Sequence, residues 1–132
     1  MTSAVGKSAE EWFRQADYDF DTAAYMFEGR RYFYAVFMCH LAIEKALKGL
    51  YAARLFAEPP RTHNLIYLIE KIDVEVPKET DKFLSVLAGL SVPTRYPDDL
   101  RRLARDFDRT RTKPVLARTK ETLKWIRRQL PQ

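Results

Sequence analysis

The sequence predicts an all-α fold, an antiparallel up-and-down four-helix bundle with an additional short helix. Apolar residues recur at intervals of three or four along four long or medium segments, no stretch alternates convincingly with a period of two, and prolines divide the segments. The 132 residues correspond to one domain, residues 1–132, and the 46% of hydrophobic residues supply one core. With only 4 glycines, the chain does not fit a turn-rich all-β fold. It contains neither GxGxxG nor GxxxxGK followed by Ser or Thr, the Gly-rich motifs that bind phosphates.

The first helix is expected over residues 8–28. Ser8 and Glu11 have the spacing of a capping box, in which the hydroxyl and the carboxylate each satisfy an amide at the helix start. Gly29 is a natural stop. One apolar stripe consists of Trp12, Ala16, Phe20, Ala23 and Phe27.

The second helix is expected over residues 31–56, before Pro59 and Pro60, which cannot continue it. A third, short helix fits residues 63–72, with Thr62 or Asn64 as its cap. A fourth helix fits residues 78–90. The inward positions of the second helix are Tyr32, Val36, Cys39, Ile43, Ala46 and Leu50.

Prolines also divide the C-terminal third. Pro93 and Pro97 are expected to bracket a loop. Residues 98–111 fit either a short helical turn or an ordered loop. The last helix is expected over residues 113–130, with Thr112 as N-cap and Pro114 in its first turn, where a missing amide costs little.

Composition excludes several classes of protein. The single cysteine, Cys39, cannot form an internal disulfide, and no CxxC motif is present for zinc or redox chemistry. The first residues show no apolar secretory segment. The longest charge-free apolar-rich run, residues 32–43, is far shorter than the roughly 20 residues that span a membrane. We therefore expect a cytoplasmic protein with no membrane partner.

Positive charge is concentrated near the C-terminus. Residues 1–94 hold 11 basic and 13 acidic side chains, whereas residues 95–132 hold 12 basic and 5 acidic ones. This asymmetry favours a local anionic partner, and arginine suits bidentate contact with phosphate. The alternative is internal pairing with Asp98, Asp99, Asp106 and Asp108. The basic segment contains Arg95, Arg101, Arg102, Arg105, Arg109, Arg111, Arg118 and Lys120.

A polar strip interrupts the apolar second helix. His40, Glu44 and Lys48 are spaced by four residues and therefore share one helix face. They offer an acceptor, a donor and a cation to a nucleotide. The alternative is an ordinary Glu44–Lys48 ion pair.

His63, which follows Arg61, is expected to open the third helix. Its ring and the neighbouring amides could meet an anion at the helix N-terminus. The alternative is a ring that bonds the backbone or the polar strip. A metal bound by His40, Glu44 and His63 would require ligands from two helices to converge. We expect no metal and no cofactor.

Aromatic residues are unusually frequent in the first two helices. One core-facing stripe cannot bury them all, and Phe13, Tyr34 and Phe37 remain outside the expected stripes. They predict a second apolar face, which a symmetric homodimer would bury. The alternative is that these rings lie under long arginine side chains.

The segment WFRQADYDFDTAAYMFEGRRYFYAVFMCHLAIEKALKGLY, followed by PPRTHNLIYLIEKI, resembles the HEPN (higher eukaryotes and prokaryotes nucleotide-binding) domain family. The similarity spans nearly the whole chain. The residues that carry it are Trp12, Ala16, Asp19, Ala23, Ala24, Tyr32, Ala35, Ala42, Glu44, Lys45, Ala46, Lys48, Thr62, His63, Asn64, Leu65, Arg95, Tyr96 and Pro97.

The resemblance implies a five-helix, all-α domain that is usually a homodimer and binds nucleotides or RNA. Many stand-alone members are similar to the partner chain of a minimal nucleotidyltransferase. Some members are metal-independent ribonucleases, toxins among them, which carry Arg, four to six intervening residues and then His. No Arg stands at that spacing before His40 or His63, and His40 occupies a position where Gln is expected in relatives of this type.

Together these observations predict a non-catalytic module that binds a nucleotide or an RNA phosphate beside a nucleotidyltransferase chain. The alternatives are a ribonuclease of the toxin type and an assembly adaptor without a ligand. No catalytic residue is expected. The predicted binding residues are His40, Glu44, Lys48, Arg61, His63, Arg95, Tyr96, Arg101 and Arg102.

Overall fold

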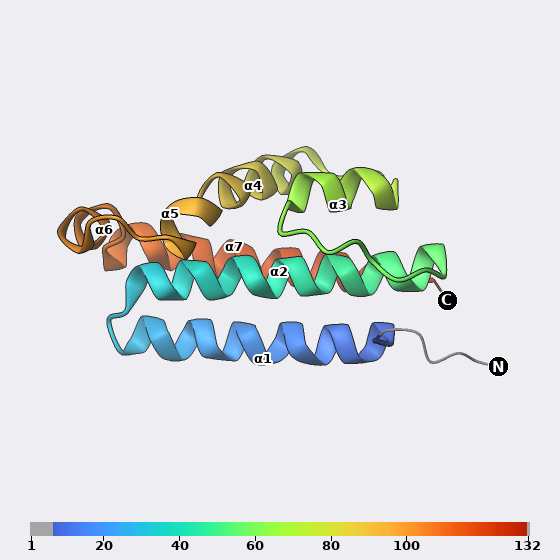
Figure 1. The fold of residues 1–132 in the computed structure, drawn as a ribbon, viewed down its shortest axis with the longest axis horizontal. Coiled ribbons are helices and arrows are strands. Elements are labelled where there is room, and N and C mark those ends of the chain that lie inside the picture. The colour runs from blue at the N-terminus through green and yellow to red at the C-terminus, as the bar shows by residue number, and fades with distance from the viewer. Residues whose placement is uncertain (1–6, 132) are drawn as a thin grey trace.

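A computed structural model describes residues 7–131 of the chain (Figure 1). This part is helical, contains no strand, and confirms the predicted all-α fold. The helices are α1 (Ala9–Glu28), α2 (Tyr32–Leu55), α3 (Leu65–Ile72), α4 (Lys78–Gly89), α5 (Ser91–Arg95), α6 (Leu100–Asp106) and α7 (Arg109–Arg128).

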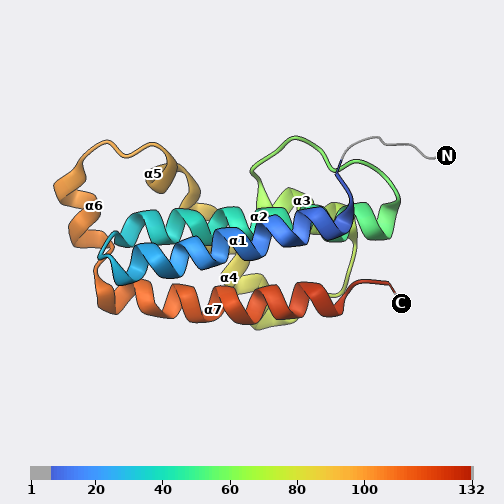
Figure 2. The ribbon, with the colours of Figure 1, turned by 90° about the horizontal axis from the view of Figure 1, so that it is seen from below.

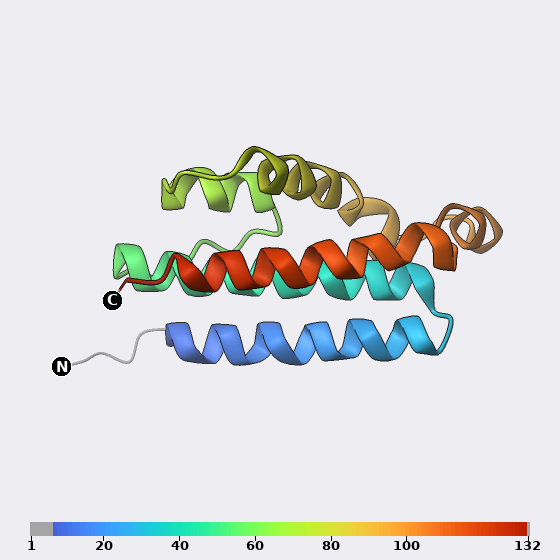
Figure 3. The ribbon, with the colours of Figure 1, turned by 180° about the vertical axis from the view of Figure 1, so that it is seen from behind.

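Helix α2 lies at the centre of the bundle. It forms an antiparallel hairpin with α1, whereas α3 and α4 lie on the opposite side of α2 (Figure 1). Helix α7 runs beside α2, as the views from below and from behind show (Figures 2 and 3). The successive long or medium helices α1, α2, α4 and α7 alternate in direction, as the prediction of an up-and-down bundle requires.

Helices α1 and α2 begin and end close to the predicted positions. The Ser8 hydroxyl accepts a hydrogen bond from the Glu11 amide at 3.1 Å, which confirms this half of the capping box. The Glu11 carboxylate instead binds the side chains of Arg14 and Gln15. Helix α2 ends at Leu55, and its C-cap Phe56 has a φ of 51°, which lies in the left-handed region.

Two predictions for the third helix and the proline-bracketed loop are wrong. Helix α3 begins at Leu65 rather than His63. Of the two predicted caps, the structure confirms Asn64, whose side chain accepts a hydrogen bond from the Tyr67 amide. The segment that contains Pro93 is helix α5 rather than a loop. Pro93 is tolerated because the amides of the first helical turn have no partner within the helix.

Helix α7 begins four residues earlier than predicted, at Arg109. The Asp108 side chain caps it by accepting a hydrogen bond from the Arg111 amide at 2.9 Å. Thr112, the predicted cap, is fully buried inside the helix, and Pro114 also lies within it. Aspartate is among the most favoured N-cap residues, so Asp108 marks the start of α7, whereas Pro114 does not. For residues 98–111, which fitted two alternatives, the structure shows a short helix with Asp99 as its cap.

The core forms around α2 because this helix is apolar on nearly all sides. Its fully buried side chains include Val36, Ile43, Leu47 and Leu50. Between residues 35 and 53 of this helix no side chain is exposed. Polar residues on α2 must therefore find partners inside the protein.

Arginine side chains cover several aromatic rings, as the alternative interpretation of the aromatic surplus expected. Phe13 is buried at 5% exposure, so the prediction that it contributes to an exposed apolar face is wrong. The guanidinium of Arg127 lies 5.0 Å from the centroid of its ring. Tyr34 is 46% exposed. The homodimer stays a prediction.

Within the described part of the chain, no helix combines the length and the apolar character needed to cross a bilayer.

Candidate functional site

A buried carboxylate is the centre of the candidate site. Glu44 lies in the middle of α2 and is 4% exposed, with His40 and Lys48 one turn before and after it. All three side chains are buried, at 1%, 4% and 8% exposure in chain order. The predicted polar strip therefore lies inside the bundle rather than on a solvated face.

Three separate parts of the chain meet at Glu44. Lys48 Nζ donates a hydrogen bond to Oε2 at 3.0 Å. His63 Nδ1, from the segment before α3, lies 3.0 Å from Oε1 and 3.2 Å from Oε2. Arg95, the last residue of α5, places Nη2 3.9 Å from Oε1. We call these residues together with His40 the Glu44 cluster.

His40 is the neutral member of this cluster. Its Nδ1 is 3.7 Å from Glu44 Oε1, which is too long for a hydrogen bond, and neither ring nitrogen has a partner within the described residues. Burial lowers the pKa of His40 to about 4, and the nearby Glu44 carboxylate opposes this shift only in part. The ring is therefore uncharged at neutral pH, and both of its nitrogens can still form a hydrogen bond.

Arg95 is a charged residue with unused donors. Its guanidinium lies 5.0 Å from the centroid of the Phe37 ring on α2, a cation–π contact that holds the group in place. Its Nε and Nη2 atoms are buried and have no hydrogen-bond partner within the described residues. A buried donor without an acceptor lowers the stability of the fold. An acceptor bound to the Arg95 guanidinium would remove this penalty.

Two residues of α1 that were not among the predicted site residues contact charged side chains of α2. Lys48 Nζ lies 5.6 Å from the centroid of the Trp12 ring, so α1 closes the site on that side. Asp19, also on α1, is 6% exposed and forms an ion pair with Lys45 at 2.8 Å. An acidic residue one turn from buried Ala16 was the sequence signal for this pair.

His63 reaches the cluster by a different route from the one predicted. It precedes the helix cap Asn64, so it does not open α3. The Asn64 side chain already accepts the Tyr67 amide at 3.0 Å. The His63 ring bonds Glu44 of the polar strip, as the alternative interpretation expected, and anion binding at this helix start stays a prediction.

The remaining predicted residues lie outside the cluster. Arg61, on the segment between α2 and α3, is exposed. Tyr96 and Arg102 line a hollow between α5 and α6, and Arg101 is exposed on α6. The structure thus divides the predicted set into a buried group at Glu44 and an exposed group at the α5–α6 end.

The alternative interpretation of the basic segment was that its arginines pair with the nearby aspartates. The structure does not show this pairing. Asp99 and Asp108 direct their carboxylates to backbone amides at the starts of α6 and α7. Among residues 7–131, the ion pairs include none between these arginines and the aspartates of residues 98–108. The guanidinium groups at this end of the molecule are therefore not held in ion pairs by these aspartates.

No group of three or more His, Cys, Asp or Glu side chains within residues 7–131 is arranged to hold a metal ion.

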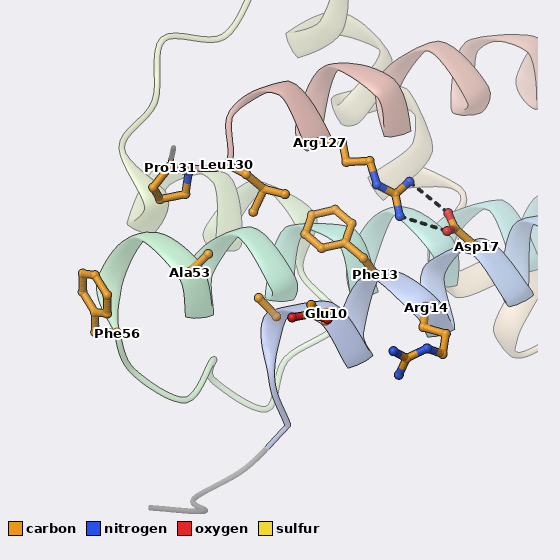
Figure 4. A pocket seen from close by; sticks show the side chains of 10 residues that line it. Glu10, Phe13, Arg14, Asp17, Ala53, Phe56, Arg127, Leu130 and Pro131 are labelled. Carbon is orange, nitrogen blue, oxygen red and sulfur yellow. Dashed lines mark hydrogen bonds and ion pairs between the residues drawn. The ribbon is translucent and has the colours of Figure 1, made fainter. Parts of the chain in front are cut away.

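A larger hollow, of about 740 Å³, lies at the other end of the bundle, where α1 begins and α2 and α7 end. Arg127 donates two hydrogen bonds to Asp17 across it, at 3.2 Å and 2.9 Å, and Phe13 forms part of its wall (Figure 4). None of its lining residues belongs to the Glu44 cluster. Size alone therefore does not identify the candidate site.

Two solved structures have a fold similar to that of this chain. The structure is similar to the crystal structure of TT1696 from Thermus thermophilus, with a TM-score of 0.82, 28% identity, and coverage of 92% of this chain and 98% of that one. It also shares its fold with ST0689, described as an archaeal HEPN homologue, with a TM-score of 0.78, 24% identity, and coverage of 96% and 100%. No curated protein matches the sequence.

The sequence model of the HEPN domain family matches residues 9–129, which is almost the entire described chain. This match agrees with the residues that carried the resemblance, since the Glu44 cluster lies within it. Family membership indicates a nucleotide-binding or RNA-related module in general. The chain belongs to the HEPN domain family.

Proposed function

We propose that this protein is a non-catalytic module that binds the phosphate of a nucleotide or RNA at the Glu44 cluster. The observation that supports the proposal is that the buried guanidinium of Arg95 has donors without an acceptor. Its guanidinium is fixed against Phe37, yet two of its nitrogens are buried without an acceptor. A phosphate oxygen would satisfy these donors through charge-assisted hydrogen bonds.

The net charge of the cluster is compatible with an anion. Lys48 and Arg95 carry two positive charges against the single negative charge of Glu44, and His40 is neutral. Glu44 holds the cations in place, and one positive charge remains for a ligand. Arg101, exposed on α6 and outside the lining of the hollow between α5 and α6, adds a further positive charge.

Arg95→Gln is the direct test. We expect titration calorimetry with a short oligoribonucleotide to show binding to the wild-type protein that Arg95→Gln weakens by tenfold or more. Arg128→Gln, at the exposed end of α7, is the matched control and should retain wild-type affinity. Equal affinity of all three proteins would remove Arg95 from the site. Lys48 is less suitable for this test because it also stabilises the buried Glu44 carboxylate.

We also propose a nucleotidyltransferase chain as the protein partner and a homodimer as the assembly. Both follow from the family resemblance. Light scattering on the purified protein tests the dimer. Co-expression with a minimal nucleotidyltransferase, followed by capture of either chain, tests the partner. A monomer that does not retain such an enzyme would contradict both proposals.

A ribonuclease is the second candidate, and one observation favours it. Glu44 holds His63 by Nδ1, so Nε2 is left for proton transfer, an arrangement found in general acid–base sites. The Arg-to-His spacing of the family's ribonucleases is nevertheless missing. We expect no RNA cleavage above that of a His63→Ala control, and robust cleavage that depends on His63 would reverse the order of the two candidates.

A further inference from the structure

A hollow lies between α5 and α6, and one of its lining residues, Tyr96, directly follows Arg95 of the Glu44 cluster. Its volume is about 380 Å³, within the range of small-ligand pockets. Helix α6 lies at the end of the bundle away from the chain termini (Figure 1). The apolar part of the lining consists of Leu90, Pro93, Leu103 and Phe107.

Tyr96 provides an exposed aromatic ring at this hollow. The residue is 66% exposed although it lines the hollow, so its ring is available for stacking. It directly follows Arg95, and the Cα atoms of consecutive residues are about 3.8 Å apart. The proposed phosphate site at Arg95 and the ring of Tyr96 are thus joined by one peptide bond, and a nucleotide that occupies both places its phosphate at Arg95 and its base at Tyr96.

The charged side chains of the hollow favour hydrogen-bond donors over phosphate. Asp98, Asp99 and Asp106 line it together with a single cation, Arg102, which leaves two net negative charges. Asp99 uses one carboxylate oxygen to cap α6, accepting the amides of Arg101 and Arg102. Asp98 and Asp106 have no such role in the helix cap. A phosphate would be repelled here, whereas a polar group rich in N–H donors would be attracted.

We propose that this hollow is a nucleobase subsite that prefers guanine, so that the module recognises guanine nucleotides or unpaired guanines in RNA. The proposal rests on the proposed function, which supplies the phosphate site. Proteins read unpaired RNA bases by stacking them on aromatic or arginine side chains and by hydrogen bonding to their edges. Tyr96 and Arg102 provide the stacking surfaces.

Guanine is the base whose edge matches a carboxylate. Its N1–H and its N2 amino group are adjacent donors that both oxygens of one carboxylate can accept. Adenine and cytosine each place a ring-nitrogen acceptor beside their amino group, and uracil places its single N–H between two carbonyls. A carboxylate facing these edges meets at least one acceptor, and a carboxylate oxygen cannot bond an acceptor because neither group carries a hydrogen to donate.

Calorimetric titrations of the full chain with GMP, AMP, CMP and UMP test the proposal. We expect GMP to bind at least tenfold more tightly than AMP. The double variant Asp98→Asn/Asp106→Asn should remove this preference while Asp99 continues to cap α6. Asp73→Asn, at an exposed position beyond α3, should keep the preference.

Two further variants separate the base from the phosphate. Tyr96→Ala should weaken all four nucleotides, whereas Tyr96→Phe should retain their affinities. Arg95→Gln should weaken all four equally and keep the order of preference. Each variant is compared with the wild type by circular dichroism, so that loss of fold is recognised.

The outcomes distinguish the two proposals. Equal binding of the four nucleotides to the wild type, or a guanine preference that survives in the double aspartate variant, overturns the guanine subsite and leaves the proposed function standing. Absence of binding by every nucleotide and by an oligoribonucleotide overturns the proposed function as well.

Discussion

His63 Nδ1 lies 3.0 Å from Glu44 Oε1, although the two residues are separated by 19 positions in the sequence and belong to different elements. The contact joins the segment before α3 to the middle of α2. The histidine ring is largely exposed, with 60% of its side chain accessible, whereas the carboxylate is buried. The pair therefore connects the interior of the bundle to its surface at the candidate site.

Removal of Lys48 should destabilise the fold. Lys48→Met leaves the buried Glu44 carboxylate without its closest lysine partner, and loss of one member of a buried ion pair is strongly destabilising. Because His63 and Arg95 remain nearby, we expect a loss of about 2–4 kcal/mol in the free energy of unfolding, measured by urea denaturation.

Two comparisons test this explanation. Arg14→Met breaks an exposed pair with Glu11 and should cost less than about 1 kcal/mol. The double variant Glu44→Gln/Lys48→Met removes the buried charge and should recover part of the loss. A double variant less stable than Lys48→Met would contradict the account.

Stability should fall in mild acid because of His40. Its pKa is about 4 in the folded protein against an ordinary value of 6.5, so between these values the unfolded chain binds a proton that the folded chain does not. The free energy of unfolding therefore decreases as the pH falls from about 6.5 toward about 4, by on the order of 2–3 kcal/mol from this residue.

His40→Gln measures this contribution. Urea unfolding at pH 7.5 and at pH 5 gives the loss of stability in acid for each protein. The difference between the two pH values should be smaller in the variant than in the wild type. An identical pH dependence in both proteins would show that His40 is not held neutral by burial.

Gly49 should not tolerate a side chain. A Cβ atom at this position would lie 2.9 Å from Cδ2 and Cε2 of Phe13 and 3.1 Å from Cβ of Trp12, where α1 and α2 approach each other. Gly49→Ala should lower the free energy of unfolding by about 1–3 kcal/mol, the usual cost of overpacking.

Gly89→Ala is its matched control. A Cβ atom at Gly89 meets nothing within 4 Å, at the last residue of α4. We expect an unchanged or slightly higher melting temperature, because alanine favours helix more than glycine does. Equal destabilisation by both substitutions would mean that the close approach of α1 and α2 is not the cause.

Cys39 should be unreactive in the folded protein. Burial raises the pKa of its thiol to about 12, and the side chain has no exposed surface, so the nucleophilic thiolate is absent at pH 8. A thiol-specific disulfide reagent should label it only as fast as the protein unfolds. Complete labelling in urea is the control, and rapid labelling without denaturant would disprove the burial.

Local patterns in the sequence predict the parts of this fold that depend on neighbouring residues. The spacing of apolar residues predicts α1, α2 and α4 nearly to their ends, because a helix that buries one stripe must repeat every 3.6 residues. The start of α7 was predicted incorrectly because Pro114 suggested a helix start, although the Asp108 cap lies earlier in the chain. Asp108 and Pro114 each suggest a different helix start, and neither residue by itself shows which of the two the chain adopts.

The four-residue spacing of His40, Glu44 and Lys48 was sufficient to place them on one face, since helix geometry is local. Their burial, the arrival of His63 and Arg95 at the same carboxylate, and the separation of Tyr96 from that cluster depend on how α3, α5 and α6 pack against α2. Such contacts join residues far apart in the chain. Their geometry, and with it the lowered pKa of His40, arises only when distant helices together exclude water from the same place.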